Sequence, residues 1–137
     1  MGLYLAVFDG DDEVDGIDVG AYSDFCLFRN AVVRNLEPRG AGTEFPTLIL
    51  HSDCDGEWTP DEAVKLEEEL ERIGRRFRQL PAVPLSSTWQ SDIAETFGIQ
   101  PTSLCECFFD VDGESLLERL IELARTSQER GLPILFQ

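Results

Sequence analysis

The chain has 137 residues, which is enough for one domain and too short for two of ordinary size. Its 11 Lys and Arg oppose 27 Asp and Glu, so the formal net charge is −16 at pH 7. Such a charge repels nucleic-acid phosphates and anionic lipids and attracts basic proteins, while an apolar content of 42% excludes a disordered chain.

The N-terminal segment does not have the features of a targeting or membrane segment. It lacks the basic start and the cleavage site of a signal peptide. No apolar run approaches the roughly 18 residues of a membrane span. We therefore expect a cytoplasmic protein that binds no membrane. Thiols stay reduced in that compartment, so the four cysteines are not expected to form a disulfide framework.

The first third of the chain predicts two strands and a helix. Residues 2–8 are a nearly continuous apolar run, which is typical of a buried strand. Apolar residues between positions 14 and 19 predict a short second strand around a turn at Asp15 and Gly16. With Ser23 as N-cap, apolar residues then recur at spacings of three and four, which predicts a helix as far as Leu36.

The middle of the chain predicts a short strand followed by a strongly marked helix. Residues 47–50 are a short apolar run and are expected to form a strand. Thr59 as the cap, Pro60 in the first turn and Glu62 as the capping-box partner mark a helix start. Apolar positions three and four apart continue this helix to about Phe77.

The last third predicts a short helix at residues 91–97, a strand at 104–111, a long helix at 115–130 and a final strand at 132–136. Together the elements indicate an α+β fold. We expect a single domain over residues 1–137, in which about three main helices pack on a mixed β-sheet.

The most acidic segment is residues 9–18, with five Asp and one Glu. Asp11, Glu13, Asp15 and Gly16 match the first, third, fifth and sixth places of an EF-hand calcium loop. The match fails at the twelfth place, where Tyr22 stands instead of Glu. A solvated acidic loop is the plain interpretation, and a protein-binding patch is the functional one.

The densest polar group is HSDCDGEW at residues 51–58, between the predicted strand and helix. An enzyme would use His51 and Asp53 as an acid–base pair, and His51 is the only histidine of the chain. In a structural role, Asp53 and Asp55 would cap turns and Trp58 would pack outside the helix start. A partner-binding loop is the third interpretation.

Cys105 and Cys107 share one face of the predicted strand and are expected to be core thiols. A zinc site with Cys54 or His51 is less favoured, because the C-x-C spacing does not match the usual loop knuckles. The sequence has no glycine-rich phosphate loop, nucleophile elbow or dinucleotide fingerprint. We therefore assign no catalytic residue, no metal ligand and no cofactor.

Three blocks of sequence, spread over nearly the whole chain, carry a family resemblance. They are MGLYLAVFDGDDEVDG at the start, FPTLILHSDCDGEWTP in the middle and CFFDVDGESLLERLIELARTSQERGLPILFQ at the end. These blocks resemble the immunity protein family 70 of bacterial polymorphic toxin systems. The resemblance implies an α+β protein that is not an enzyme, and that binds and blocks a toxin domain made by the same cell or its kin.

The family role is binding, so the binding residues are sought in the two acidic segments. An acidic inhibitor is able to occupy the basic groove of a nuclease toxin and to steer its own association. We expect a monomer whose two segments form one acidic face, with Trp58 as an apolar anchor, and whose partner is the cognate toxin domain and not a nucleic acid. The candidate residues are Asp9, Asp11, Asp12, Glu13, Asp15, Asp53, Asp55, Glu57 and Trp58.

Two other functions stay open from the sequence. One is a small metal-dependent or hydrolytic enzyme that uses His51 and Asp53. The other is an acidic DNA mimic or adaptor, which would share the negative surface but would bind several unrelated basic proteins.

Overall fold

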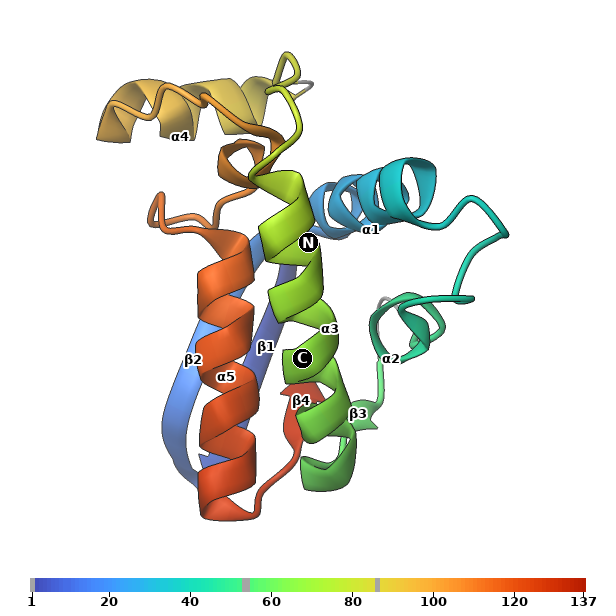
Figure 1. Ribbon diagram of the computed structural model, residues 1–137. Coiled ribbons are helices and arrows are strands. Elements are labelled where there is room, and N and C mark those ends of the chain that lie inside the picture. The colour runs from blue at the N-terminus through green and yellow to red at the C-terminus, as the bar shows by residue number, and fades with distance from the viewer. Residues whose placement is uncertain (1, 53–54, 86) are drawn as a thin grey trace.

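The computed structural model describes residues 2–52, 55–85 and 87–137 and has the predicted α+β fold. Its four-stranded sheet has the order β2-β1-β4-β3. Figure 1 shows the long helices α3 and α5 side by side in front of this sheet. The described elements are β1 (Gly2–Asp9), β2 (Asp12–Ala21), α1 (Tyr22–Leu36), α2 (Pro46–Ile49), β3 (Glu57–Trp58), α3 (Pro60–Phe77), α4 (Thr88–Phe97), the 3₁₀ helix η1 (Leu104–Cys107), α5 (Leu116–Arg130) and β4 (Ile134–Phe136).

The sheet is antiparallel at each described pairing, so the prediction of a mixed sheet is wrong. β1 pairs with β2 on one side and with β4 on the other, and β4 pairs with β3. β1 and β3 run in the same direction, but β4 lies between them and runs the opposite way. The last strand of the chain, β4, therefore lies between the two strands that run in the same direction, and no parallel pair is formed among the described strands.

The hairpin between β1 and β2 turns earlier than predicted. The turn lies at Gly10 and Asp11, where Gly10 has a left-handed φ of 64°. Gly16 lies instead inside β2, opposite Ala6. The Tyr4 hydroxyl occupies the space that a Cβ at Gly16 would need. The Asp-Gly pair therefore provides room for an aromatic side chain from the neighbouring strand and does not form the turn.

Local caps place the starts of the main helices. α3 begins where predicted: the Glu62 N–H donates to Thr59 Oγ1 at 3.2 Å, and the Thr59 N–H donates to Glu62 Oε1 at 3.0 Å. α1 begins slightly earlier than predicted, because the Ala21 N–H donates to the Asp24 carboxylate and Ala21 takes the N-cap position in place of Ser23.

Two segments predicted to be strands are helical. Residues 46–49 form α2, and the Thr47 and Leu48 N–H groups donate to the Glu69 carboxylate of α3 at 3.2 and 3.1 Å. Residues 104–107 form η1, and a single bridge between Phe109 and Ser115 follows. The donors at the start of α2 are thus satisfied by a buried side chain from a different helix.

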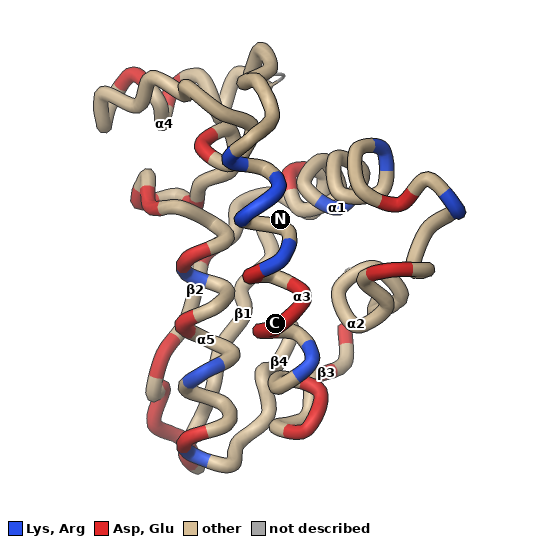
Figure 2. The backbone as a smooth tube through the Cα atoms, viewed as in Figure 1, with Lys and Arg blue, Asp and Glu red and all other residues tan. Residues whose placement is uncertain are grey.

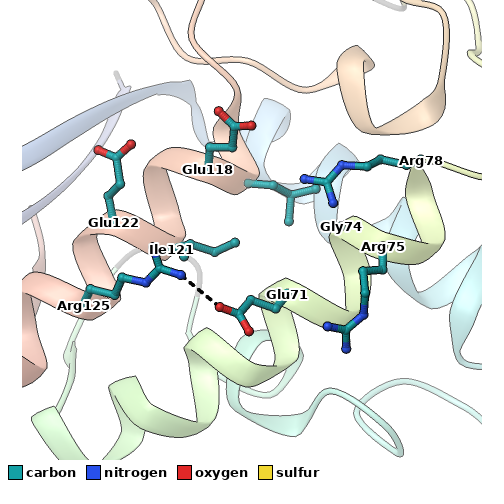
Figure 3. Close-up of a pocket in the computed structure, with 9 residues that line it drawn as sticks. Glu71, Gly74, Arg75, Arg78, Glu118, Ile121, Glu122 and Arg125 are labelled. Atoms are coloured by element: carbon teal, nitrogen blue, oxygen red, sulfur yellow. Dashed lines mark hydrogen bonds and ion pairs between the residues drawn. The ribbon is translucent and has the colours of Figure 1, made fainter.

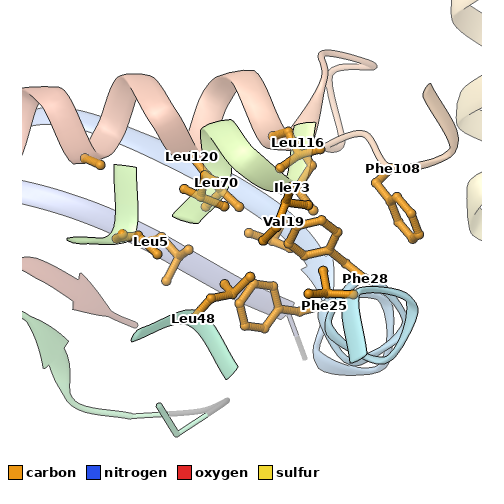
Figure 4. Close-up of a cluster of buried hydrophobic side chains, with 14 of the residues drawn as sticks. Leu5, Val19, Phe25, Phe28, Leu48, Leu70, Ile73, Phe108, Leu116 and Leu120 are labelled. Atoms are coloured by element: carbon orange, nitrogen blue, oxygen red, sulfur yellow. The ribbon is translucent and has the colours of Figure 1, made fainter. Parts of the chain in front are cut away.

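The core lies between one face of the sheet and the helices (Figure 4). The apolar stripes predicted for α1, α3 and α5 all contribute to this core. Burying one large apolar side chain stabilises the fold by about 1.5–3 kcal/mol, so the core offsets the self-repulsion of an acidic chain. Labelled members in Figure 4 are Leu5, Val19, Phe25, Phe28, Leu48, Leu70, Ile73, Phe108, Leu116 and Leu120.

Candidate partner-binding site

The hairpin turn presents three of the predicted binding residues to solvent. Asp11, Asp12 and Glu13 are exposed. Glu13 also accepts a hydrogen bond of 2.6 Å from the Tyr4 hydroxyl, which fixes one carboxylate oxygen and leaves the side chain at the surface. These carboxylates are accessible to a partner.

Two other hairpin candidates face the helices. Asp9 Oδ2 lies 3.1 Å from Arg130 Nη2, and Asp15 Oδ1 lies 3.1 Å from Arg119 Nη2. Both arginines belong to α5, so these carboxylates help attach the hairpin to that helix. Asp15 lies opposite Val7, whereas Glu13 lies opposite Phe8, which points to the other side of the sheet. The two carboxylates therefore point in opposite directions and do not form a calcium loop.

The second acidic segment lies at the opposite edge of the sheet. Asp55 and Glu57 are exposed, and Glu57 belongs to the edge strand β3, whereas the hairpin ends in the edge strand β2. At about 4.8 Å per strand, the two edges are roughly 14 Å apart. The structure does not bring the two segments together as one loop cluster. Asp53 lies outside the described residues.

Trp58, predicted as an apolar anchor for the partner, is fully buried and lies in the core of this structure. Its indole N–H donates to the Thr47 carbonyl at 3.0 Å, and its ring packs against His51 and Phe136. The pairing of β3 with the central strand β4 turns this ring towards the core. Trp58 therefore connects α2 to the sheet and does not reach a partner.

His51 has a structural environment. Its Nδ1 lies 2.8 Å from the Ser52 carbonyl and its Nε2 lies 2.8 Å from the Glu57 carbonyl. The ring stacks on Phe136, with 4.4 Å between centroids and 19° between planes, and lies 4.9 Å from Trp58. A general base needs a ring nitrogen that reaches substrate. Both nitrogens of His51 are occupied by backbone oxygens, so the imidazole holds the loop in place.

The cysteines do not form a described metal site. Cys105 and Cys107 are buried in η1 and not on a strand, and Cys107 Sγ lies 3.5 Å from the Ser103 carbonyl. Burial raises the pKa of the Cys105 thiol, which makes it a weaker nucleophile. Cys54 lies outside the described residues. Within residues 2–52, 55–85 and 87–137, no three or more His, Cys, Asp or Glu side chains are placed to hold a metal ion.

A groove of about 380 Å³ runs between α3 and α5 (Figure 3). Arg125 crosses it, with Nη2 3.1 Å from Glu71 Oε1 and Nε 2.8 Å from Glu67 Oε2. The lining offers carboxylates, guanidinium groups and aliphatic carbon, without a hydroxyl, thiol or imidazole. Its carboxylates are the acid–base groups that this lining offers, and Glu71 among them is paired with Arg125. The lining residues are Glu71, Gly74, Arg75, Arg78, Leu117, Glu118, Ile121, Glu122 and Arg125.

The described residues define a class of protein: an acidic α+β protein whose hairpin and edge strand β3 carry exposed carboxylates. None of the described helices is long and apolar enough to cross a membrane.

The family model for immunity protein 70 matches residues 3–136, and the chain belongs to this family of immunity proteins of toxin systems. The match confirms the resemblance seen in the three sequence blocks. No match was found among curated proteins or among solved structures.

Proposed function

We propose that this chain binds the cognate toxin domain of a polymorphic toxin system and neutralises it by occupying its surface. The observation that carries the proposal is the family match over residues 3–136. In this role the protein works as a monomeric domain in the cytoplasm, and it needs no catalytic residue and no cofactor.

The charge of the chain supports a basic partner, for which a nuclease toxin is the natural class. A nuclease must hold phosphates and therefore exposes Lys and Arg. A chain with a net charge of −16 is attracted to such a surface. Electrostatic steering of this kind raises association rate constants by roughly 10- to 1000-fold at low salt.

The environment of His51 makes the enzymatic alternative less favoured. Its ring nitrogens face the Ser52 and Glu57 carbonyl oxygens, so an acid–base role would require this loop to open. The negative charge would suit an acidic DNA mimic or general adaptor equally well. Such a protein would bind several unrelated basic proteins, whereas an immunity protein binds its cognate toxin domain.

The test is protection of growing cells. The toxin domain encoded beside this gene is expressed with and without this chain, and the two proteins are then purified together. We expect restored growth and a stoichiometric complex, with no protection against unrelated toxin domains. Failure of both protection and complex formation would overturn the proposal. Binding to many unrelated basic proteins with equal strength would favour the adaptor.

A further inference from the structure

The sheet has one face that the described helices do not cover. Tyr4 and Phe8 of β1 and Leu135 of β4 point away from Leu5 and Val7, which belong to the core. These three side chains are half-buried and stand outside the core cluster. α3 and α5 lie on the other side of the sheet (Figure 1). We call the uncovered side the open face.

Three exposed carboxylates share the open face with this apolar group. The pairing register places Asp18 opposite Tyr4, Glu13 opposite Phe8 and Glu57 opposite Leu135. Residues directly opposite in an antiparallel pair point to the same side of a sheet. Glu13 and Glu57, which belong to separate acidic segments, therefore flank one surface that crosses all four strands.

The open face contains no positive charge from its own strands. β1, β2, β3 and β4 contain no Lys and no Arg, and all 11 basic residues lie on helices and connecting segments (Figure 2). The two arginines that reach the sheet, Arg119 and Arg130, bind carboxylates on its helix side. Among the described residues, no ion pair involves Glu13, Asp18 or Glu57.

We propose that the open face is the docking surface for a basic protein partner, with Tyr4, Phe8 and Leu135 as its apolar centre and Glu13, Asp18 and Glu57 as its acidic rim. An apolar centre inside a polar rim is the usual anatomy of a protein interface. Here the rim has one sign only, so it selects a surface rich in Lys and Arg.

Charge complementarity fixes the kind of occupant. Two copies of this chain meeting through their open faces would bring carboxylates against carboxylates, which disfavours a symmetric dimer. A basic partner has no such penalty. The inference rests on the proposed function for the partner's identity, since it takes the cognate toxin domain as the occupant.

The experiment compares two variants with the same net charge. The open-face variant carries Glu13→Gln, Asp18→Asn and Glu57→Gln, and each replacement keeps an oxygen that accepts hydrogen bonds. The matched control carries Glu68→Gln, Glu95→Gln and Glu129→Gln, which are exposed positions on α3, α4 and α5. Thermal unfolding of both variants first confirms that they fold.

Association with the toxin domain encoded beside the gene is then measured by surface plasmon resonance at low and high salt. We expect the open-face variant to lower the association rate constant by about tenfold or more at low salt and the control to lower it far less. Equal loss in the two variants would overturn the docking surface while leaving toxin neutralisation intact. No binding by the unmodified chain would instead overturn the proposed function.

A second measurement covers the case in which the open-face variant does not fold. In the complex of the unmodified chain, NMR signals of Tyr4, Phe8 and Leu135 should shift on binding, whereas those of Ile121 and Leu117 in the groove between α3 and α5 should not. Shifts confined to the groove would contradict the proposal.

Discussion

The Tyr4 hydroxyl on the open face has a clearly raised pKa. The phenol donates to Glu13 Oε1 at 2.6 Å. This hydrogen bond, then burial, then the charges of Glu13, Asp18 and Asp15 raise the pKa of Tyr4 from 10.0 to about 12. The causes act in one direction because each disfavours the phenolate: the hydrogen bond needs the phenol proton, burial penalises the charged form, and the carboxylates repel a second negative charge.

The pH dependence of stability follows from this shift. The folded state holds the Tyr4 proton more tightly than the unfolded state, so the resulting stability is complete below pH 10 and is lost as the pH rises towards 12. We predict that Glu13→Gln moves the pKa of Tyr4 back towards 10.0 and reduces this loss. Phenolate absorbance in a Tyr22→Phe background measures the titration, with Glu129→Gln as the control. An unchanged titration in Glu13→Gln would show that Glu13 does not hold the phenol.

Sequence reasoning identified the acidic positions but not the directions in which they point. Alternation alone puts Glu13 and Asp15 on the same face of a strand. The register shift between Val7 and Phe8 instead places Asp15 opposite Val7 on the helix side and Glu13 opposite Phe8 on the open face. No spacing in the sequence signals this bulge. The position of Asp18 on the open face also depends on pairing, since it lies opposite Tyr4 of β1, and it was likewise missed.

At the scale of elements, the helices with local signals were predictable and the short segments were not. The capping box at Thr59 marks where α3 begins, and the apolar stripe of α3 marks which face of the helix is buried. A run of four apolar residues has no resolvable period, so residues 47–50 fit a strand as well as a helix. What decides α2 is Glu69, which lies about twenty residues further along the chain.

This dependence of α2 on Glu69 gives a stability prediction. The Glu69 side chain is 6% exposed and accepts from both the Thr47 and Leu48 N–H groups. Glu69→Gln replaces one acceptor oxygen by a donor NH₂ facing an N–H group, so we expect a loss of about 1–3 kcal/mol in the free energy of unfolding. Urea denaturation measures it. The neighbouring Glu68→Gln, at an exposed position, should change stability by about 0.5 kcal/mol or less. Equal effects at the two positions would mean that Glu69 does not cap α2.

At the scale of the whole molecule, charge is distributed unevenly. The strands contribute acidic residues without any basic residue, while α3 and α5 carry most of the arginines (Figure 2). The ion pairs that oppose the excess negative charge differ in exposure: the side chains of Arg125 and Arg130 are 54% and 47% exposed, whereas that of Arg119 is 18% exposed. Exposed pairs contribute roughly 0–1 kcal/mol each, so repulsion among the unpaired carboxylates should dominate the salt response.

We therefore predict that added NaCl stabilises the fold at neutral pH. The Debye length is about 10 Å at 0.1 M salt, so screening relieves the long-range repulsion that follows from a net charge of −16. The midpoint of urea unfolding should rise with NaCl concentration. In the control variant with Glu68→Gln, Glu95→Gln and Glu129→Gln, the midpoint should start higher at low salt and rise less, because part of the repulsion is already removed. A midpoint that falls with NaCl would mean that the ion pairs of α5 stabilise the fold by more than the remaining carboxylates destabilise it.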